Sequence, residues 1–241
     1  MACHAGQHRA TVKVMLIAFT NTKGGVGKST LASHLAIWLF DRGYRVALLD
    51  ADEQETAARW VRAAEPALSV VTATEMEAIQ KARTRLLASH DIVVADTPGK
   101  ESDAARTVTL LCDLAIVPLQ PSKPDLRAIK DALKNIRLAQ EISASGRPEA
   151  CLVLNLTAKL DVQTQALRKQ LEAAGFPVAQ TMVRRLNALR DACDTAVTRM
   201  KPSESGEAAR DIDALFTELL GEKLANVKRV SEATMEKAAN E

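Results

Sequence analysis

A glycine-rich segment near the start of the chain contains the residue types that bind phosphate. Glycines allow backbone N–H groups to turn toward an anion without Cβ clashes, and the helical pattern that follows would add partial positive charge. The ammonium group of Lys28 is predicted to contact the β- and γ-phosphates of a nucleotide, and the hydroxyl group of Ser29 is predicted to bind Mg²⁺. The candidate phosphate-binding residues are Lys23, Gly24, Gly25, Val26, Gly27, Lys28, Ser29 and Thr30.

Carboxylates follow two further apolar runs of the chain. Asp50 and Asp52 stand at the end of one run, and Asp96 ends another, directly before Thr97-Pro98-Gly99. Acidic residues beside a phosphate-binding loop can hold Mg²⁺, directly or through water, or can position an attacking water molecule. An isolated Asp-x-Asp is a weak signal because turns are rich in aspartate. Its position after a strand is what makes these residues candidates for metal binding and hydrolysis.

The elements that must position these residues alternate along the chain. Short runs that are apolar throughout predict strands of a parallel sheet covered on both faces, and longer helical patterns separate them. The predicted strands are 14–20, 45–50, 68–72, 92–96, 114–118, 151–155 and 178–182, and the predicted helices are 28–42, 54–64, 74–89, 102–111, 124–143, 162–174 and 206–220. This order predicts an α/β fold, a doubly wound, mostly parallel sheet with helices on both faces and ligands at the C-terminal strand edge.

Local signals refine these elements. Thr74 with Glu77 resembles a capping box, Gly175 stands where a helix would end, and the composition of 201–206 predicts a loop. Trp60 is interpreted as a core anchor.

Composition divides the chain only at its ends. Its 241 residues suit one domain, predicted over 14–221, between a flexible N-terminal arm at 1–13 and a polar C-terminal tail at 222–241. The 4 cysteines have no metal-binding spacing, which favours a reducing, cytoplasmic compartment. The sequence shows neither a signal peptide nor a membrane-spanning apolar run. A net charge of +2 neither demands nor forbids nucleic acid.

The phosphate-binding segment departs from the usual P-loop pattern at its start. A strict G-x-x-x-x-G-K-[ST] loop would have glycine at position 22, whereas this chain has Thr22 followed by Lys23. The segment resembles the deviant Walker A motif, KGGxGK[ST], of the ParA/MinD family of dimeric ATPases. Within that family the chain is most similar to small, ParF-like ParA partition ATPases. The resemblance implies a P-loop NTPase that uses ATP and Mg²⁺.

The resemblance also implies roles for individual residues. Lys23 would reach across a homodimer to the partner's nucleotide, Asp52 would orient the hydrolytic water, and Asn155 would read the adenine edge. Mg²⁺ would be held by Ser29 with support from Asp50 and Asp96. Glu53 stands where the family usually has proline, which puts the local turn in doubt.

Partners follow from the same resemblance. The ATP dimer would bind nonspecific double-stranded DNA through Arg184, Arg185 and Arg190, and a ParB-like centromere-binding protein would stimulate hydrolysis. Phosphate contacts by basic side chains suit binding that ignores base sequence. A solvated helix face with interspersed acidic residues is an equally good interpretation of these arginines. The predicted function is DNA or plasmid partition by a cytoplasmic, nucleoid-associated ATPase.

Two alternative functions stay open within the same ATPase type. A MinD-like, membrane-associated positioning ATPase would need a C-terminal amphipathic helix, but 222–241 has few bulky apolar residues and no aromatic residue, so no membrane partner is expected. A ParA-like cargo-positioning or DNA-transfer ATPase would share every motif above. An iron–sulfur reductase component would need a cysteine shortly after Asp96, and a bacterial tyrosine kinase would need a tyrosine cluster, whereas Tyr44 is the only tyrosine.

Overall fold

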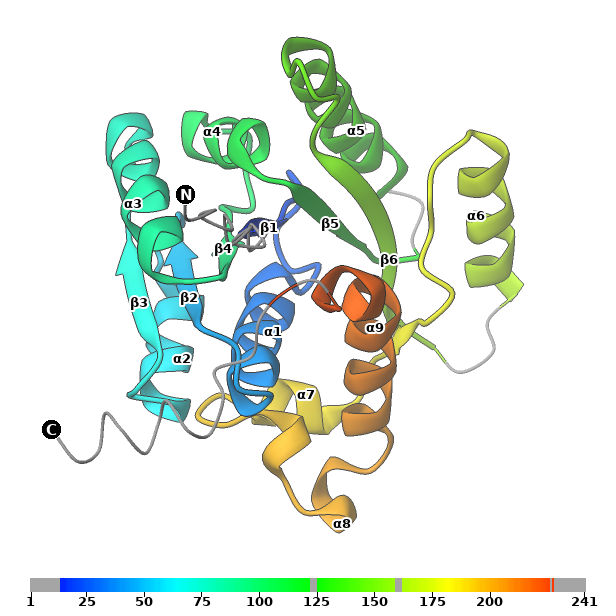
Figure 1. Cartoon of the computed structure of the whole chain (residues 1–241). Helices are drawn as coiled ribbons and strands as arrows, with labels where there is room; N and C mark the ends of the chain where they lie inside the picture. The colour runs from blue at the N-terminus through cyan, green and yellow to red at the C-terminus, as the bar shows by residue number, and fades with distance from the viewer. Residues whose placement is uncertain (1–13, 122–124, 159–161, 226, 228–241) are drawn as a thin grey trace, which may run out of the picture.

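The fold is a seven-stranded, all-parallel sheet with strand order β3-β2-β4-β1-β5-β6-β7 and helices on both faces (Figure 1). The computed structural model describes residues 14–121, 125–158, 162–225 and 227. The predicted N-terminal arm and most of the predicted tail lie outside these residues. The doubly wound fold predicted from the alternation of apolar runs and helical patterns is confirmed.

The strands are short and the central ones are buried along their whole length. Their bounds are β1 Met15–Phe19, β2 Val46–Asp50, β3 Ser69–Thr72, β4 Ile92–Asp96, β5 Leu114–Leu119, β6 Glu149–Thr157 and β7 Val183–Arg184. The helices are α1 Lys28–Asp41, α2 Thr56–Ala64, α3 Met76–Ser89, α4 Asp103–Leu111, α5 Asp125–Ile142, α6 Val162–Ala173, α7 Asn187–Asp191, the 3₁₀ helix η1 Val197–Arg199, α8 Pro202–Ser205 and α9 Glu207–Leu224.

Two hydrophobic clusters cover the two faces of the sheet. Helices α1, α2 and α9 pack on one face together with α7 and η1, and helices α3, α4, α5 and α6 pack on the other (Figure 1). Trp60 of α2 is buried in the first cluster, and its indole N–H donates to the Thr195 carbonyl, which confirms its interpretation as a core anchor. Because both faces are covered, the strands can be apolar throughout.

The structure corrects three local expectations. The last strand is Val183–Arg184 rather than 178–182, and Val178 forms only an isolated bridge with Leu152. Helix α3 begins at Met76 after Glu75, which makes no side-chain capping bond, so the predicted capping box at Thr74 does not form. Segment 201–206 contains the short helix α8 rather than only a loop, because a proline at its first position is compatible with a helix start.

Gly175 follows α6 with a φ of 79°, as predicted for a helix end. Helix α9 extends to Leu224, into the segment predicted as tail. Within the described residues, no helix has the length and apolar character needed to span a membrane.

Candidate nucleotide-binding and ATPase site

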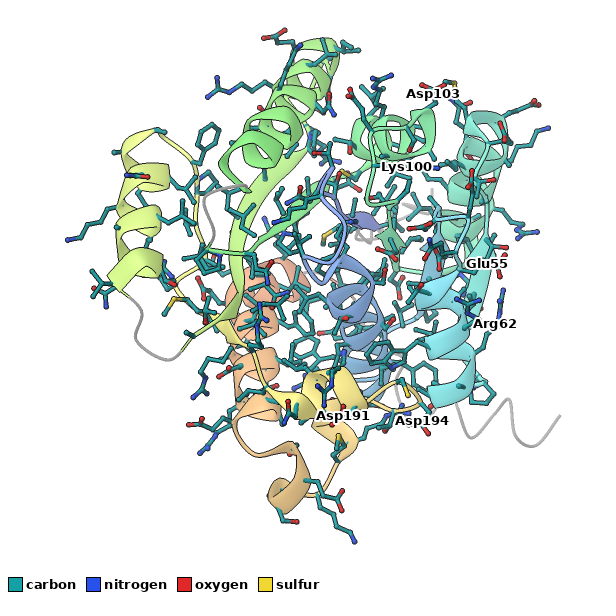
Figure 2. All side chains as sticks on the ribbon, turned by 180° about the vertical axis from the view of Figure 1, so that it is seen from behind. Glu55, Arg62, Lys100, Asp103, Asp191 and Asp194 are labelled. Atoms are coloured by element: carbon teal, nitrogen blue, oxygen red, sulfur yellow. The ribbon has the colours of Figure 1, made fainter. Side chains whose placement is uncertain are left out.

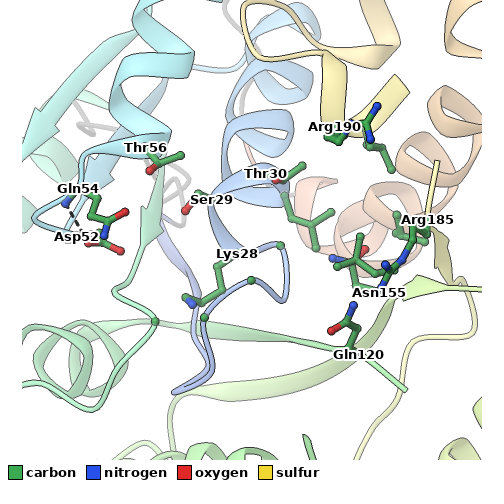
Figure 3. A pocket seen from close by; sticks show the side chains of 18 of the residues that line it. Lys28, Ser29, Thr30, Asp52, Gln54, Thr56, Gln120, Asn155, Arg185 and Arg190 are labelled. Atoms are coloured by element: carbon green, nitrogen blue, oxygen red, sulfur yellow. Dashed lines mark hydrogen bonds between the residues drawn. The ribbon is translucent and has the colours of Figure 1, made fainter. Parts of the chain in front are cut away.

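The candidate site is a cavity of about 820 Å³ at the carboxyl edge of the parallel strands. It is lined by the loops after β1, β2 and β4 and by the segment that leads from β7 into α7 (Figure 3). Parallel register brings these strand ends to one edge, so residues distant in sequence share one cavity. The sequence predicted this edge from the three motifs.

The phosphate-binding loop has the backbone geometry of an anion cradle. Gly25 and Gly27 have φ angles of 74° and 93°, which favour glycine, and Gly27 stands directly before the first residue of α1. Lys28 is buried, and its Nζ donates to the Lys23 carbonyl at 3.2 Å. Burial lowers the pKa of Lys28, while Asp96 and Asp52 oppose that shift. A bound phosphate would give this ammonium group the charge partner that a carbonyl does not supply.

Lys23 is held at the entrance of this loop by its backbone. Its N–H donates to the Asn21 carboxamide oxygen at 3.0 Å, and the same carboxamide donates to the Pro118 carbonyl at 2.8 Å. Asn21 is buried and therefore anchors the loop entrance to the end of β5. The role of Lys23 toward a second subunit stays a prediction.

Asp50 and Asp52 have different environments although they are two residues apart. Asp50 is fully buried, and its two carboxylate oxygens accept hydrogen bonds from the backbone N–H groups of Asp52 and Ala58. Asp50 therefore shapes the loop after β2, and the Mg²⁺ support predicted for it would have to compete with these bonds. Asp52 lines the cavity, with one oxygen accepting from the Gln54 N–H at 3.0 Å (Figure 3).

Asp96, the last residue of β4, has a fully buried carboxylate. Within the described part of the chain, neither of its oxygens has a hydrogen-bond partner of regular geometry. Burial raises the pKa of Asp96 to about 7; Asp50 adds to the rise, and the nearby Ser29 hydroxyl and Lys28 oppose it. A buried carboxylate costs free energy unless a cation or donor meets it. Its interactions with Ser29 and Lys28 fit a carboxylate that would meet Mg²⁺ or a water bound to it.

The described residues offer few side chains that could bind a metal ion. Among the residues that the structure describes, no cluster of three or more His, Cys, Asp and Glu side chains could hold a metal ion. Ser29 and Asp96 stay the predicted protein groups for Mg²⁺, and phosphate oxygens and water would complete its coordination. This donor set suits a Mg²⁺ that arrives with a nucleotide, where it would neutralise charge on the phosphates.

The loop after β4 packs directly on the phosphate-binding loop. A Cβ added at Gly99 would lie 2.8 Å from the Gly24 Cα and 3.3 Å from the Lys28 Nζ, so only glycine allows this approach. The next residue, Lys100, forms an exposed ion pair with Glu53 at 3.6 Å. Glu53 therefore connects the loop after β2 with the loop that carries Gly99, at the position where the resembling family usually has proline.

The structure separates the remaining predicted residues. Asn155 is buried and its Nδ2 donates to the Val26 carbonyl at 2.7 Å, so it contacts the phosphate-binding loop. Arg184 points away from the cavity into α9, where it pairs with Asp211 at 2.6 Å and Glu207 at 2.5 Å. A guanidinium held by two carboxylates is poorly suited to bind DNA phosphate, so we do not propose Arg184 as a DNA contact.

Arg185 and Arg190 both line the cavity (Figure 3). The sequence suggested DNA contact for them but did not place them beside the nucleotide. It also missed Gln120 and Asn187, which line the same cavity. Gln120 directly follows β5, so its place at a strand end was the available signal.

Comparisons with known proteins agree with this geometry. A model of the CobQ/CobB/MinD/ParA nucleotide binding domain matches residues 17–199. The chain is 32% identical over 218 residues to the maintenance of carboxysome distribution protein A of Halothiobacillus neapolitanus, covering 88% of this chain and 99% of the relative. It is 27% identical over 214 residues to protein virC1 of Rhizobium radiobacter, covering 86% and 85% of the two chains.

A solved structure of another protein has a similar fold. Cobyrinic acid a,c-diamide synthase from Mycobacterium smegmatis, with a bound ATP analogue and magnesium, has a TM-score of 0.64 at 19% identity, covering 86% of this chain and 95% of that chain. The family match spans the whole phosphate-binding loop, both aspartate motifs and Asn155. The chain therefore belongs to the CobQ/CobB/MinD/ParA family and is a P-loop ATPase of the ParA/MinD type that uses ATP and Mg²⁺.

Proposed function

We propose that this ATPase is a dimerising switch that positions a cargo on nonspecific DNA. In the ATP state two copies would close over their nucleotides, with Lys23 of each copy reaching the other's phosphates. The observation that carries this proposal is the open side of the phosphate-binding loop. Gly24 and Gly25 are exposed, while Lys28 of the same chain is buried at the loop, so a second cation has room to approach from outside.

Hydrolysis would end the ATP state. Asp52 lies in the cavity beside the loop that carries Gly99 and is the residue we assign to the attacking water. Lys28, Lys23 and Mg²⁺ would balance the charge that develops on the γ-phosphate. Removal of a cation supplied by a second subunit costs on the order of 10³-fold in rate in related phosphoryl-transfer systems.

The proposal also concerns the class of cargo that the ATPase positions. The relative from Halothiobacillus neapolitanus is named for carboxysome distribution, which supports a cargo-positioning ATPase of this type. Partition of a plasmid, with stimulation by a ParB-like centromere-binding protein, is the form in which the cargo is itself DNA. Both forms share the same ATP-dependent dimer and the same DNA-bound state.

One experiment tests the shared part of the proposal. The purified protein is examined by light scattering and by binding to random-sequence duplex DNA, each with ATP, with ADP and without nucleotide, and liposomes serve as a parallel surface. We expect a dimer and DNA binding only with ATP, and no nucleotide-dependent liposome binding. ATP-dependent liposome binding in place of DNA binding would favour the MinD-like alternative.

The variant Lys23→Ala tests the contact between subunits. It should retain nucleotide binding through Lys28 but lose the ATP-dependent dimer. Lys81→Ala is a matched control, because Lys81 is an exposed lysine of α3 that pairs with Glu77 far from the cavity. If Lys23→Ala dimerises as well as Lys81→Ala does, the role assigned to Lys23 is wrong.

A further inference from the structure

The end of β6 makes an unusual contact with the phosphate-binding loop. The Nδ2 group of Asn155 donates to the Val26 carbonyl at 2.7 Å, and the Asn155 side chain is buried with 3% of its surface exposed. A Cβ added at Gly27 would lie 2.2 Å from the same Nδ2 atom. The carboxamide therefore fills the space beside Gly27, and a side chain at position 27 would clash with it.

The backbone of β6 is irregular where it delivers this side chain. The register between β6 and β7 shifts between Asn155 and Thr157, and Leu156 has a φ of 56°. A left-handed conformation is unfavourable for a leucine, and such bulges re-aim the neighbouring side chains. Non-glycine residues persist in this region only where the surrounding structure holds them, and they cluster at functional sites.

Peptide geometry turns this contact into an effect on the phosphate site. The Val26 carbonyl and the Gly27 N–H belong to one planar peptide group and point in opposite directions. A hydrogen bond that holds the carbonyl toward β6 must aim the Gly27 N–H away from β6. Gly27 lines the cavity and directly precedes the first residue of α1, where backbone N–H groups receive phosphate.

We propose that Asn155 is a positioning residue for the triphosphate, which fixes the Val26–Gly27 peptide so that the Gly27 N–H faces the phosphates. This role differs from contact with the adenine edge, which the family resemblance implies for Asn155. The bond to Val26 commits one of the two carboxamide N–H groups to the loop rather than to a base. The inference rests on the ATPase site itself and is independent of DNA, cargo and dimerisation.

Two ligands separate loop positioning from base reading. Affinities for Mg²⁺–ATP and for Mg²⁺–tripolyphosphate, which has no base or ribose, are measured by titration calorimetry for the wild type and Asn155→Ala. If Asn155 positions the loop, the variant should bind both ligands roughly tenfold more weakly, because a buried carbonyl loses its partner and the peptide is free to turn. Weaker ATP binding with unchanged tripolyphosphate binding would overturn the proposal, as would unchanged binding of both ligands.

Two further variants serve as controls, one for a failure of Asn155→Ala to fold and one for a general effect of the strand end. Asn155→Leu keeps an uncharged side chain of similar size without a donor, and it should show the same parallel loss if Asn155→Ala does not fold. Thr157→Val is the matched control, because Thr157 is also buried at the end of β6 and donates to the Val183 carbonyl at 3.4 Å rather than to the loop. This control should bind both ligands like the wild type, and a loss equal to that of the Asn155 variants would assign the effect to the strand end instead.

Discussion

Asp50, the last residue of β2, and Asp52, two residues later, show how far the environments of neighbouring motif positions can differ. Asp50 has no exposed surface and satisfies two backbone N–H groups, whereas Asp52 is partly exposed and faces the cavity. Both could be assigned to the metal or to water from their spacing alone. Their hydrogen bonds show that Asp50 holds the loop after β2 in place, and the role of Asp52 in hydrolysis stays a prediction.

The two aspartates should therefore respond differently to truncation. Asp50→Ala leaves two buried N–H groups without an acceptor and should lower the free energy of unfolding by roughly 2–4 kcal/mol. Asp52→Ala loses one exposed bond, should cost about 1 kcal/mol or less, and should abolish ATP turnover while ATP still binds. Denaturant unfolding and steady-state phosphate release measure the two effects. Normal turnover in Asp52→Ala would remove this residue from the hydrolytic step.

His34 is a buried residue whose protonation state is coupled to folding. Its Nδ1 bonds with the Thr30 carbonyl at 2.8 Å, and its Nε2 accepts from the Val197 N–H at 3.3 Å. Nδ1 therefore carries the proton, and a second proton on Nε2 would face an N–H donor. Burial lowers the pKa of His34 to about 4, from a usual value of 6.5.

Stability should fall with acid because of this histidine. Between pH 6.5 and about 4 the unfolded chain binds a proton at His34 that the folded protein does not, so the free energy of unfolding decreases as pH falls through this window. The loss due to His34 should be on the order of 3 kcal/mol. Denaturant unfolding of the wild type and of His34→Gln, measured across this pH range, gives the contribution by difference. Parallel pH profiles for the two proteins would contradict it.

At the scale of elements, the start of α2 is one of two strained points of the site, the other being Leu156 in β6. Glu55 precedes α2 with a φ of 49° and makes no side-chain cap, and the nearest cation on α2 is Arg62, 3.7 Å away in an exposed pair (Figure 2). The Glu55 N–H donates to the Asp52 carbonyl at 3.0 Å, so the left-handed turn closes the loop that carries Asp52. The geometry of Asp52 therefore depends on a conformation that a glutamate adopts at a cost.

Substitution at position 55 should reveal this strain. Glu55→Gly removes the left-handed penalty and should raise the free energy of unfolding by up to about 1 kcal/mol, offset in part by the greater freedom of glycine in the unfolded chain. Glu55→Val places a β-branched residue in the same conformation and should lower stability by roughly 1–2 kcal/mol. Urea unfolding of both variants checks the order. If valine is tolerated as well as glycine, the turn is not strained.

At the scale of the whole molecule, the basic residues near the cavity divide between structure and surface. Arg184 joins β7 to α9 through Asp211 and Glu207, while Arg185 and Arg190 lie at the cavity. Figure 2 shows Asp191, the last residue of α7, and Asp194, three residues later, and Arg190 pairs with Asp191 at 2.8 Å. Of these three arginines, Arg185 and Arg190 line the cavity, and a dimer would bring two copies of them together.

Arg190 is the residue at which we test the DNA surface. Arg190→Glu should weaken ATP-dependent DNA binding and reduce the slope of log affinity against log salt by about 0.9 for each DNA phosphate that the variant no longer binds. ATP affinity must be measured in the same variant, because Arg190 also lines the nucleotide cavity. Lys81→Glu carries the same charge change on α3, away from the cavity, as a control. Equal DNA binding by both variants would place the DNA surface elsewhere.

Local chemistry was predictable from the sequence because its signals are local. Glycines at fixed spacing before a helix, and aspartates at the ends of apolar runs, specify a phosphate cradle and acidic strand ends without reference to the rest of the chain. Parallel strands align their carboxyl ends, so the motif positions also predicted that Ser29, Asp52 and Asp96 would meet at one edge. The family resemblance extended this to ATP and Mg²⁺, and the matched family model confirms the nucleotide-binding family.

Only the tertiary structure decided what each polar side chain does at that edge. Whether Asp50 bonds to backbone, whether Arg184 faces α9, and whether Asn155 contacts Val26 depend on packing between segments far apart in the chain. The last strand lay beyond prediction for the same reason, since two residues of β7 form a strand only because β6 lies beside them. The sequence pattern predicts where strands, helices and motif residues occur. The direction of each side chain is set by the neighbours that folding brings to it.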